Sequence, residues 1–369
     1  MFTLTADQEL FQATTAHFLA AHYSTERIRE MRYAPAFEPA IWTQGADLGW
    51  TSLLVSEDDG GGSISGNGLA DLLVVAYHFG HHVAPGPLLA SNVVALALSR
   101  WGTAQQRRGP LADILSGAAV AAWAGPANGL HAARAGEHVL LNGSVACVDG
   151  AADAHHLLVS ADGDVPISQY LVPISAAGIT LAPLEALDLT RRFHRVTFNG
   201  VRLPASACVG EPGNGADQDA ALLDVIAVLQ AGEIAGAMHR AFEMTLQWTF
   251  DRYSFGRPLA SYQEIKHRIA DLRMHLEACE AVAARAARAV GEQAPDASTW
   301  AAAAKAYAGR HGPELIQDCI QLHGGIGVTF EHDLHLFLRR AATDAQMYGT
   351  PAGASRRVAQ LIEPAGAAS

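Results

Sequence analysis

Long uninterrupted hydrophobic runs are absent from this sequence of 369 residues, although half of its residues are hydrophobic. No stretch reaches the roughly 18 consecutive apolar residues that a membrane-spanning helix needs, so the sequence predicts no membrane insertion. The N-terminal residues Asp7, Glu9 and His17 do not fit the basic and then apolar layout of a signal peptide. We therefore expect a cytoplasmic protein.

Cysteine is scarce, and its spacing excludes two kinds of site. The four cysteines are isolated from one another: Cys147, Cys208, Cys279 and Cys319. Without paired spacing they indicate neither a zinc knuckle nor a disulfide framework, and we expect reduced thiols. The 17 histidines include the adjacent pairs His81-His82 and His155-His156, which do not point at one ion as an i, i+4 pair on a helix would. The sequence therefore predicts no metal site.

Charged residues are also few, at 17% of the chain, and 37 acidic residues outnumber 25 basic ones. A nucleic-acid partner needs clustered lysine and arginine, so a net charge of −12 with scattered basic residues argues against one. Small acyl or nucleotide ligands fit this composition better. A chain of this length buries a large core and is expected to divide into two or three subdomains.

Three patterns follow one another along the chain. Residues 1–115 carry apolar residues at three- and four-residue spacing, which predicts helices. Residues 116–215 contain short β-rich runs, and the steps Asn142-Gly143 and Asn199-Gly200 between apolar residues predict hairpins. Residues 216–369 return to a helical pattern that predicts a four-helix bundle. The expected helices of this bundle cover Ala221–Phe250, Tyr262–Gly291, Thr299–Gln321 and Leu334–Tyr348.

Two polar segments have the composition of a ligand-binding loop but not its context. The run Gly60-Gly61-Gly62 lacks the preceding strand and the following Gly-Lys-Ser/Thr of a phosphate-binding loop, so we interpret it as a connector. The segment Asp188–Arg192 lies between two β segments and is interpreted as a solvated turn. Contact of its basic residues with ligand phosphates is the alternative.

Three long segments of the helical C-terminal region stand out: Arg252–Leu259, Tyr262–Asp271 and Gln321–Thr329. In this order and spacing they resemble the signature segments of the acyl-CoA dehydrogenase family, and the resemblance covers nearly the whole chain. It implies an α+β fold with an N-terminal helical domain, a central antiparallel β-barrel and a C-terminal four-helix bundle. It also implies FAD-dependent α,β-dehydrogenation of an acyl-CoA thioester, in which a glutamate removes the α-proton and the flavin takes the β-hydride.

In this family the flavin lies at a subunit interface. The resemblance implies that the part lent by the neighbouring subunit consists here of Arg252, Phe255, Gln263, Gln321, Gly324 and Gly325. Arg252 would hold the pyrophosphate with its planar fork of donors, and the glycines would allow close approach at the adenine end. The plainer alternatives are a helix-end arginine that binds carbonyls and glycines that end a helix. Their occurrence together favours the flavin role.

The part of the site that comes from the same subunit is changed. The family's Thr-Glu-Pro and Trp-Ile-Thr words, which hold the flavin ring, correspond to Ala124-Gly125-Pro126 and Ala146-Cys147-Val148. Tyr348 stands where the usual base glutamate is expected, and a phenol with an ordinary pKa of about 10 is a poor base at neutral pH. The position that carries the base in some relatives reads Ile226, followed by Ala227 where most relatives have a substrate-side arginine.

The resemblance leaves three interpretations. In the first, the chain is a non-catalytic subunit that lends half of a flavin site to a homologous catalytic chain, in a dimer or tetramer that acts on acyl-CoA and passes electrons to an acceptor flavoprotein. By analogy with two-chain members of the family, the acyl group would be of steroid type.

The second interpretation is an active homo-oligomer with an atypical base. Asp224 is its weak candidate, for which a surface or helix-dipole role is the simpler explanation, and Glu233 is weaker still. The third is a flavin-free scaffold, against which the retained Arg252 and Gln321 argue.

Overall fold

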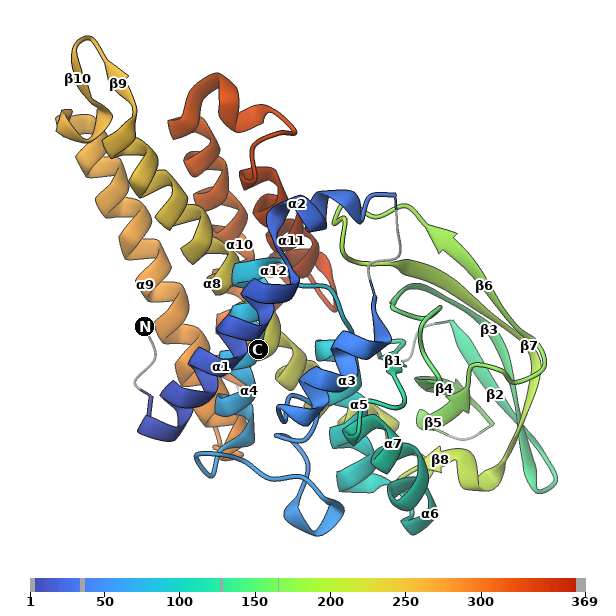
Figure 1. Cartoon of the computed structure of the whole chain (residues 1–369). Coiled ribbons are helices and arrows are strands. Elements are labelled where there is room, and N and C mark those ends of the chain that lie inside the picture. Colours follow the sequence, from blue (N-terminus) through green and yellow to red (C-terminus); the bar gives the residue numbers. More distant parts are fainter. Residues whose placement is uncertain (1–3, 34–36, 127–128, 165, 363–369) are drawn as a thin grey trace, which may run out of the picture.

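The structure is a computed structural model that describes residues 4–33, 37–126, 129–164 and 166–362. Its N-terminal helices lie between a β-sheet region on one side and a bundle of C-terminal helices on the other (Figure 1). Helices, sheet and helices follow one another along the chain in this order. The predicted α+β fold class is confirmed.

The N-terminal region is helical, as its apolar spacing predicts. Its helices are α1 (Ala6–His22), α2 (Thr25–Glu30), α3 (Pro39–Asp47), α4 (Gly68–His82), α5 (Leu88–Trp101), α6 (Ala104–Gln106) and α7 (Ala112–Leu115). Helix α1 begins at a capping box between Thr5 and Gln8, and α4 begins where the Asn67 side chain accepts from the backbone N–H of Ala70. Most of α4 and nearly all of α5 are buried, so these two helices form the centre of the helical core.

The described β region is one eight-stranded sheet in the order β6-β7-β3-β2-β4-β5-β8, with β1 paired to β4. Its strands are β1 (Ala121–Trp123), β2 (Leu130–Ala135), β3 (His138–Asp149), β4 (His156–Gly163), β5 (Ser168–Pro173), β6 (Ile179–Leu184), β7 (Phe193–Pro204) and β8 (Cys208–Val209). Most neighbours are antiparallel, but β1 and β2 each pair with β4 in parallel. The sheet encloses a hydrophobic cluster separate from the helical core.

The hairpins predicted at Asn142-Gly143 and Asn199-Gly200 are wrong. Both steps lie inside long strands, opposite each other in the β3 and β7 pair, where the register shifts. The backbone N–H of Gly200 donates to Oδ1 of Asn142 at 2.8 Å, and Gly143 and Gly200 have φ values of 126° and 62°. The irregularity bends the two strands while their pairing continues on both sides. The Asn-Gly signal therefore reports a left-handed backbone without a chain reversal.

The C-terminal region contains the four predicted helices and a fifth that was not predicted. They are α8 (Gly215–Asp251), α9 (Gln263–Gly291), α10 (Ala297–His323), α11 (Leu334–Gln346) and α12 (Pro351–Ile362). Helix α12 packs on α10 and has no fully buried residue. A small hairpin of β9 (Tyr253–Ser254) and β10 (Arg257–Pro258) joins α8 to α9 and protrudes at one end of the bundle (Figure 1).

Helix α8 is the central helix of the bundle. By length and composition alone it could cross a membrane, with a mean hydropathy of 1.6 over its most apolar window, although its apolar residues are interrupted by polar ones. Within the protein, 89% of that window is buried. Burial against other helices accounts for its apolar character.

Helices α4 and α8 cross with their backbones in direct contact. A Cβ atom built on Gly80 would lie 1.8 Å from the carbonyl oxygen of Glu233, and one built on Gly236 would lie 1.8 Å from the carbonyl oxygen of Tyr77. Only glycine fits at these two positions, because any side chain would force the helices apart.

We predict that Gly236→Ala destabilises the protein by about 1–3 kcal/mol, because the added methyl group overpacks this crossing. The change should lower the urea midpoint of unfolding at an unchanged slope. Gly109→Ala is the matched control, since a Cβ there meets nothing within 4 Å. Equal midpoints for Gly236→Ala and the control would contradict the close crossing.

Candidate functional site

A pocket of about 460 Å³ lies where the end of α11 meets the sheet. Its lining residues come from the segment after β1, from β3, from the start of β7 and the segment before it, and from the end of α11 and the two residues after it: Ala124, Gly125, Pro126, Val145, Ala146, Cys147, Leu187, Phe193, Ala342, Thr343, Gln346, Met347 and Tyr348. The fold thus brings together the three segments that the resemblance pairs with the flavin-holding words and with the base. We call this space the junction pocket.

The junction pocket is mainly apolar and has no carboxylate among its described lining residues. Its ionisable groups are Cys147 and Tyr348. Cys147 is exposed and stands at an irregularity of β3 with a φ of 59°, whereas Cys208, Cys279 and Cys319 are buried free thiols. The described walls therefore offer no acid or base suited to removing an α-proton at neutral pH.

Tyr348 forms an aromatic wall of this pocket. Its ring stacks on Trp123 with centroids 5.0 Å apart and planes 18° from parallel. Its hydroxyl donates to the carbonyl oxygen of Trp123 at 3.3 Å. Burial, and then the charge of Asp149, raise the pKa of Tyr348 well above its ordinary value. The phenol therefore stays neutral and serves as a ring surface and hydrogen-bond donor.

Asp149, whose charge raises the pKa of Tyr348, belongs to a buried network of charges. Arg191 donates to Asp149 at 2.7 Å and to Asp344 at 3.0 Å, and it also pairs with Glu233. These partners come from β3, α11 and α8. Arg191 is 5% exposed, so hydrogen bonds to these carboxylates replace the ones that water would make to its guanidinium.

A second buried arginine extends this network. Arg340 on α11 donates to Asp188 at 2.6 Å, to the carbonyl oxygen of Ala84 at 3.0 Å and to the hydroxyl of Thr190. Burial would raise the pKa of Asp188, but the charges of Arg340 and Arg191 outweigh it and hold that pKa below its ordinary value. We call Arg191, Arg340 and their carboxylate partners the arginine network.

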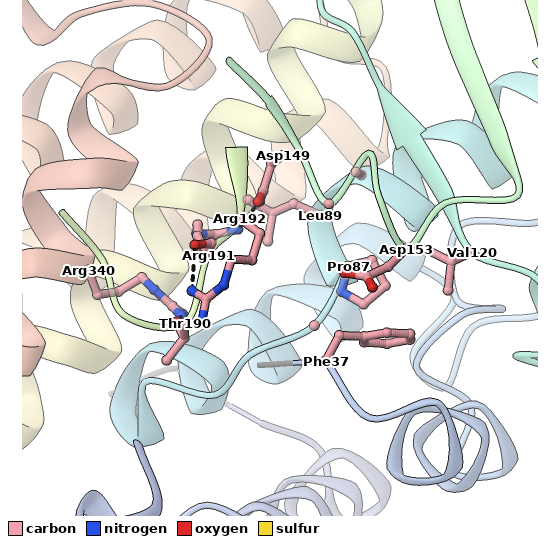
Figure 2. A pocket seen from close by; sticks show the side chains of 13 residues that line it. Phe37, Pro87, Leu89, Val120, Asp149, Asp153, Thr190, Arg191, Arg192 and Arg340 are labelled. Atoms are coloured by element: carbon pink, nitrogen blue, oxygen red, sulfur yellow. Dashed lines mark hydrogen bonds and ion pairs between the residues drawn. The ribbon is translucent and has the colours of Figure 1, made fainter. Parts of the chain in front are cut away.

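The interpretation of Asp188–Arg192 as a solvated turn is wrong. Asp188, Thr190 and Arg191 are all buried, because the segment is pulled inward by partners on α8 and α11 that its sequence neighbourhood does not reveal. Figure 2 shows this segment beside Arg340 and Asp149 around a small cavity. The cavity has a volume of about 30 Å³, room for roughly two water molecules and too little for an acyl group.

Glu233 and Asp224, the two carboxylates that the sequence offers as candidate bases, both have other partners. Glu233 is 1% exposed and paired with Arg191 and Arg340. Asp224 accepts from the Ser298 hydroxyl at 2.6 Å and pairs with Arg357 of α12 at 2.8 Å. Neither lines the junction pocket, and Ile226 between them is buried in the helical core.

The six residues that the resemblance assigns to a neighbour's flavin lie together at one end of the bundle, away from the junction pocket. Arg252 precedes β9, Phe255 is the 98% exposed tip of the hairpin, and Gln263 begins α9. Gln321, Gly324 and Gly325 lie at the end of α10 and are also exposed. A Cβ added to either glycine would meet nothing within 4 Å, so this surface is open.

Sequence reasoning missed three residues that shape the pocket and its surroundings: Trp123, Lys305 and Arg340. Trp123 immediately precedes the Ala124-Gly125-Pro126 segment, so its place beside that segment could have indicated that it lies near the pocket. Lys305 lies at helical spacing with the buried residues Ala301 and Ala308. A charged residue on such an apolar face indicates a buried partner.

Comparison with known proteins identifies the family. The sequence matches the profile of the acyl-CoA dehydrogenase N-terminal domain over residues 5–118 and that of the acyl-CoA dehydrogenase C-terminal domain over residues 213–362. The chain belongs to the acyl-CoA dehydrogenase family, whose characterised members include FAD-binding enzymes. The resemblance seen in the signature segments is confirmed.

Similar proteins include actinobacterial enzymes. Acyl-CoA dehydrogenase IpdE2 of Mycolicibacterium smegmatis is 29% identical over 357 residues, which cover 96% of this chain and 98% of that protein. A chain of the Tcur3481-Tcur3483 steroid acyl-CoA dehydrogenase is 27% identical, with a TM-score of 0.86 and coverage of 96% and 97%. A chain of the ChsE4-ChsE5 complex from Mycobacterium tuberculosis shares the fold. It is 24% identical with a TM-score of 0.87, and the match covers 98% of this chain and 98% of that chain.

We predict that Arg191→Met destabilises the protein by roughly 3–5 kcal/mol, because it leaves buried carboxylates without their partner. Urea unfolding of the purified variant measures the loss. Arg195→Met, an exposed position on β7, should change stability by no more than about 0.5 kcal/mol. A loss below about 1 kcal/mol for Arg191→Met would mean that the arginine network does not hold the sheet to the bundle.

Proposed function

We propose that this chain is a subunit of a two-chain acyl-CoA dehydrogenase, and that it lends its exposed bundle end to a flavin held by a homologous catalytic partner. The observation that carries this proposal is a difference between two regions of one chain. The side chains suited to a neighbour's flavin are grouped and exposed, whereas the junction pocket has no described carboxylate.

The exposed end suits a dinucleotide. The Arg252 guanidinium is poised over the Trp248 ring, 5.9 Å from its centroid, with no carboxylate partner among the described ion pairs. An arginine in this state can donate two parallel hydrogen bonds to a pyrophosphate. Open space above Gly324 and Gly325 suits an adenine approaching the backbone.

The division of labour follows from which groups each chain would supply. FAD, when bound, would supply the acceptor for the β-hydride, and an acceptor flavoprotein would then take its electrons. This chain would bind and orient the flavin's pyrophosphate and adenine through Arg252, Gln263 and Gln321, with Phe255 packing against the partner. The partner would supply the carboxylate that removes the α-proton, because Tyr348 remains a neutral phenol.

The relatives suggest a substrate class. The name of the Tcur3481-Tcur3483 steroid acyl-CoA dehydrogenase joins two components and states a steroid substrate class. By analogy, we propose that the pair containing this chain acts on a bulky, steroid-type acyl-CoA in the cytoplasm. Fold-level likeness alone does not fix a substrate, so this class rests on that relative.

An active homo-oligomer with Asp224 as its base is less well supported. The Asp224 carboxylate is paired with Arg357 and accepts from Ser298, and it lies outside the described lining of the junction pocket. To act as a base it would have to leave both partners. A flavin-free scaffold would have no use for the exposed Arg252.

We predict that the purified chain is colourless alone and that it is yellow when co-purified with its homologous partner, at about one flavin for each pair of chains. Visible absorption measures both, because flavin absorbs where protein does not. The partner alone is the control. A chain that is yellow alone and bleaches with an acyl-CoA would contradict the lending role.

We predict that Arg252→Ala weakens flavin binding by the pair about 10- to 150-fold, since a hydrogen bond to a charged group contributes roughly 1.5–3 kcal/mol. Flavin titration of the deflavinated pair measures the change. Arg310→Ala removes the same charge at a 71% exposed position on α10 and should leave the affinity unchanged. Equal affinities for the two variants would exclude Arg252 from the flavin site.

A further inference from the structure

The last turn of α11 ends against a buried lysine. Lys305 of α10 is 4% exposed, and its ammonium donates to the backbone carbonyl oxygens of Asp344 and Met347 at 2.5 and 2.8 Å. Its third hydrogen bond goes to Oε1 of Gln230 at 2.6 Å. The final carbonyls of a helix lack intrahelical partners and carry its negative dipole end, so a cation is suited to this place.

Gln230 of α8 completes the arrangement. Its Nε2 donates to the same Met347 carbonyl at 3.3 Å, so this oxygen accepts from side chains of two other helices. The chain just after α11 is thereby held from α8 and from α10.

The next residue has a backbone that needs such support. Tyr348 has a φ of 55°, in the left-handed region that residues with side chains rarely adopt, and Gly349 follows with a φ of 118°. A conformation of this kind persists where surrounding contacts impose it. Here the contacts are the two donors on the preceding carbonyl and the Trp123 ring beneath the phenol.

We propose that Lys305 is a positioning residue that fixes the Met347 carbonyl and thereby holds the Tyr348 ring against Trp123 as a wall of the junction pocket. The positive charge is part of this function, because a neutral amine offers one donor fewer and no attraction for the helix end. The inference concerns the chain by itself and holds whether or not it lends a surface to a partner's flavin.

The electrostatic surroundings of Lys305 make its hydrogen bonds to the end of α11 sensitive to pH. Burial outweighs the opposing charge of Asp344 and lowers the pKa of Lys305 to about 7. Asp344 has its own pKa raised by burial and by Glu233, and it also pairs with Arg191. Gln230, which faces Lys305 from α8, is neutral. The ammonium therefore loses its proton as the pH rises through about 7.

The composition provides a direct test, because the chain has only two lysines, Lys266 and Lys305. Labelling lysine at the ε carbon gives two NMR signals, and Lys266→Arg identifies which one belongs to Lys305. We expect the Lys305 signal to titrate near pH 7. The ring signals of Tyr348, identified through Tyr348→Phe, should shift with the same midpoint because the ring moves relative to Trp123.

The variant Lys305→Met keeps most of the side chain and removes the donors. Its Tyr348 signals are expected to stay at the high-pH position of the wild type at every pH, whereas Lys266→Met should titrate as the wild type does. Tyr348 signals that are identical in wild type and Lys305→Met would overturn the proposal. If Lys305→Met does not fold, wild-type Tyr348 signals that stay fixed while Lys305 titrates would overturn it as well.

Discussion

The arrangement of the whole chain depends on the ion pairs of Arg191. This guanidinium joins Asp149 of the sheet to Glu233 of α8 and Asp344 of α11, and none of the four groups has full access to water. Separating them would leave charges buried without partners, which is far more costly than losing an exposed ion pair. Sheet and bundle can therefore meet in one orientation. The junction pocket is the space that this orientation leaves, so its shape follows from the network beneath it.

The same constraint accounts for the distribution of polar groups over the chain. Carboxylates near the junction are taken up by Arg191 and Arg340, and the pocket above them is left apolar. The opposite situation holds at the protruding end of the bundle, where Arg252 and the Phe255 tip are exposed. Because the flavin of this family lies at a subunit interface, these two regions of one chain face different flavins in any oligomer. The feature that supports two unlike chains is that the junction pocket has no carboxylate among its described lining residues.

The sequence predicted what is encoded locally or in long motifs. Apolar spacing located four C-terminal helices, and the signature segments identified the family. The Asn-Gly steps were misjudged because their backbone preference suits a strand irregularity as well as a turn. The segment Asp188–Arg192 was misjudged because its partners lie more than 40 residues away on α8 and α11. At the site, the sequence alone showed no glutamate at the position that the resemblance pairs with the base. The stacking of Tyr348 on Trp123 and the hydrogen bonds of Lys305 could be found only from the fold.

The resemblance pairs Tyr348 with the family's base glutamate, and the surroundings of Tyr348 suit a neutral phenol. Its ring is supported by Trp123, its backbone by Lys305 and Gln230, and its neutral state by burial and by Asp149. A carboxylate at this position would be desolvated beside Asp149, and both effects favour its protonated form. The arginine that could offset them, Arg191, is already shared among three carboxylates. The charges of the junction thus stabilise a neutral aromatic wall and disfavour an ionised base.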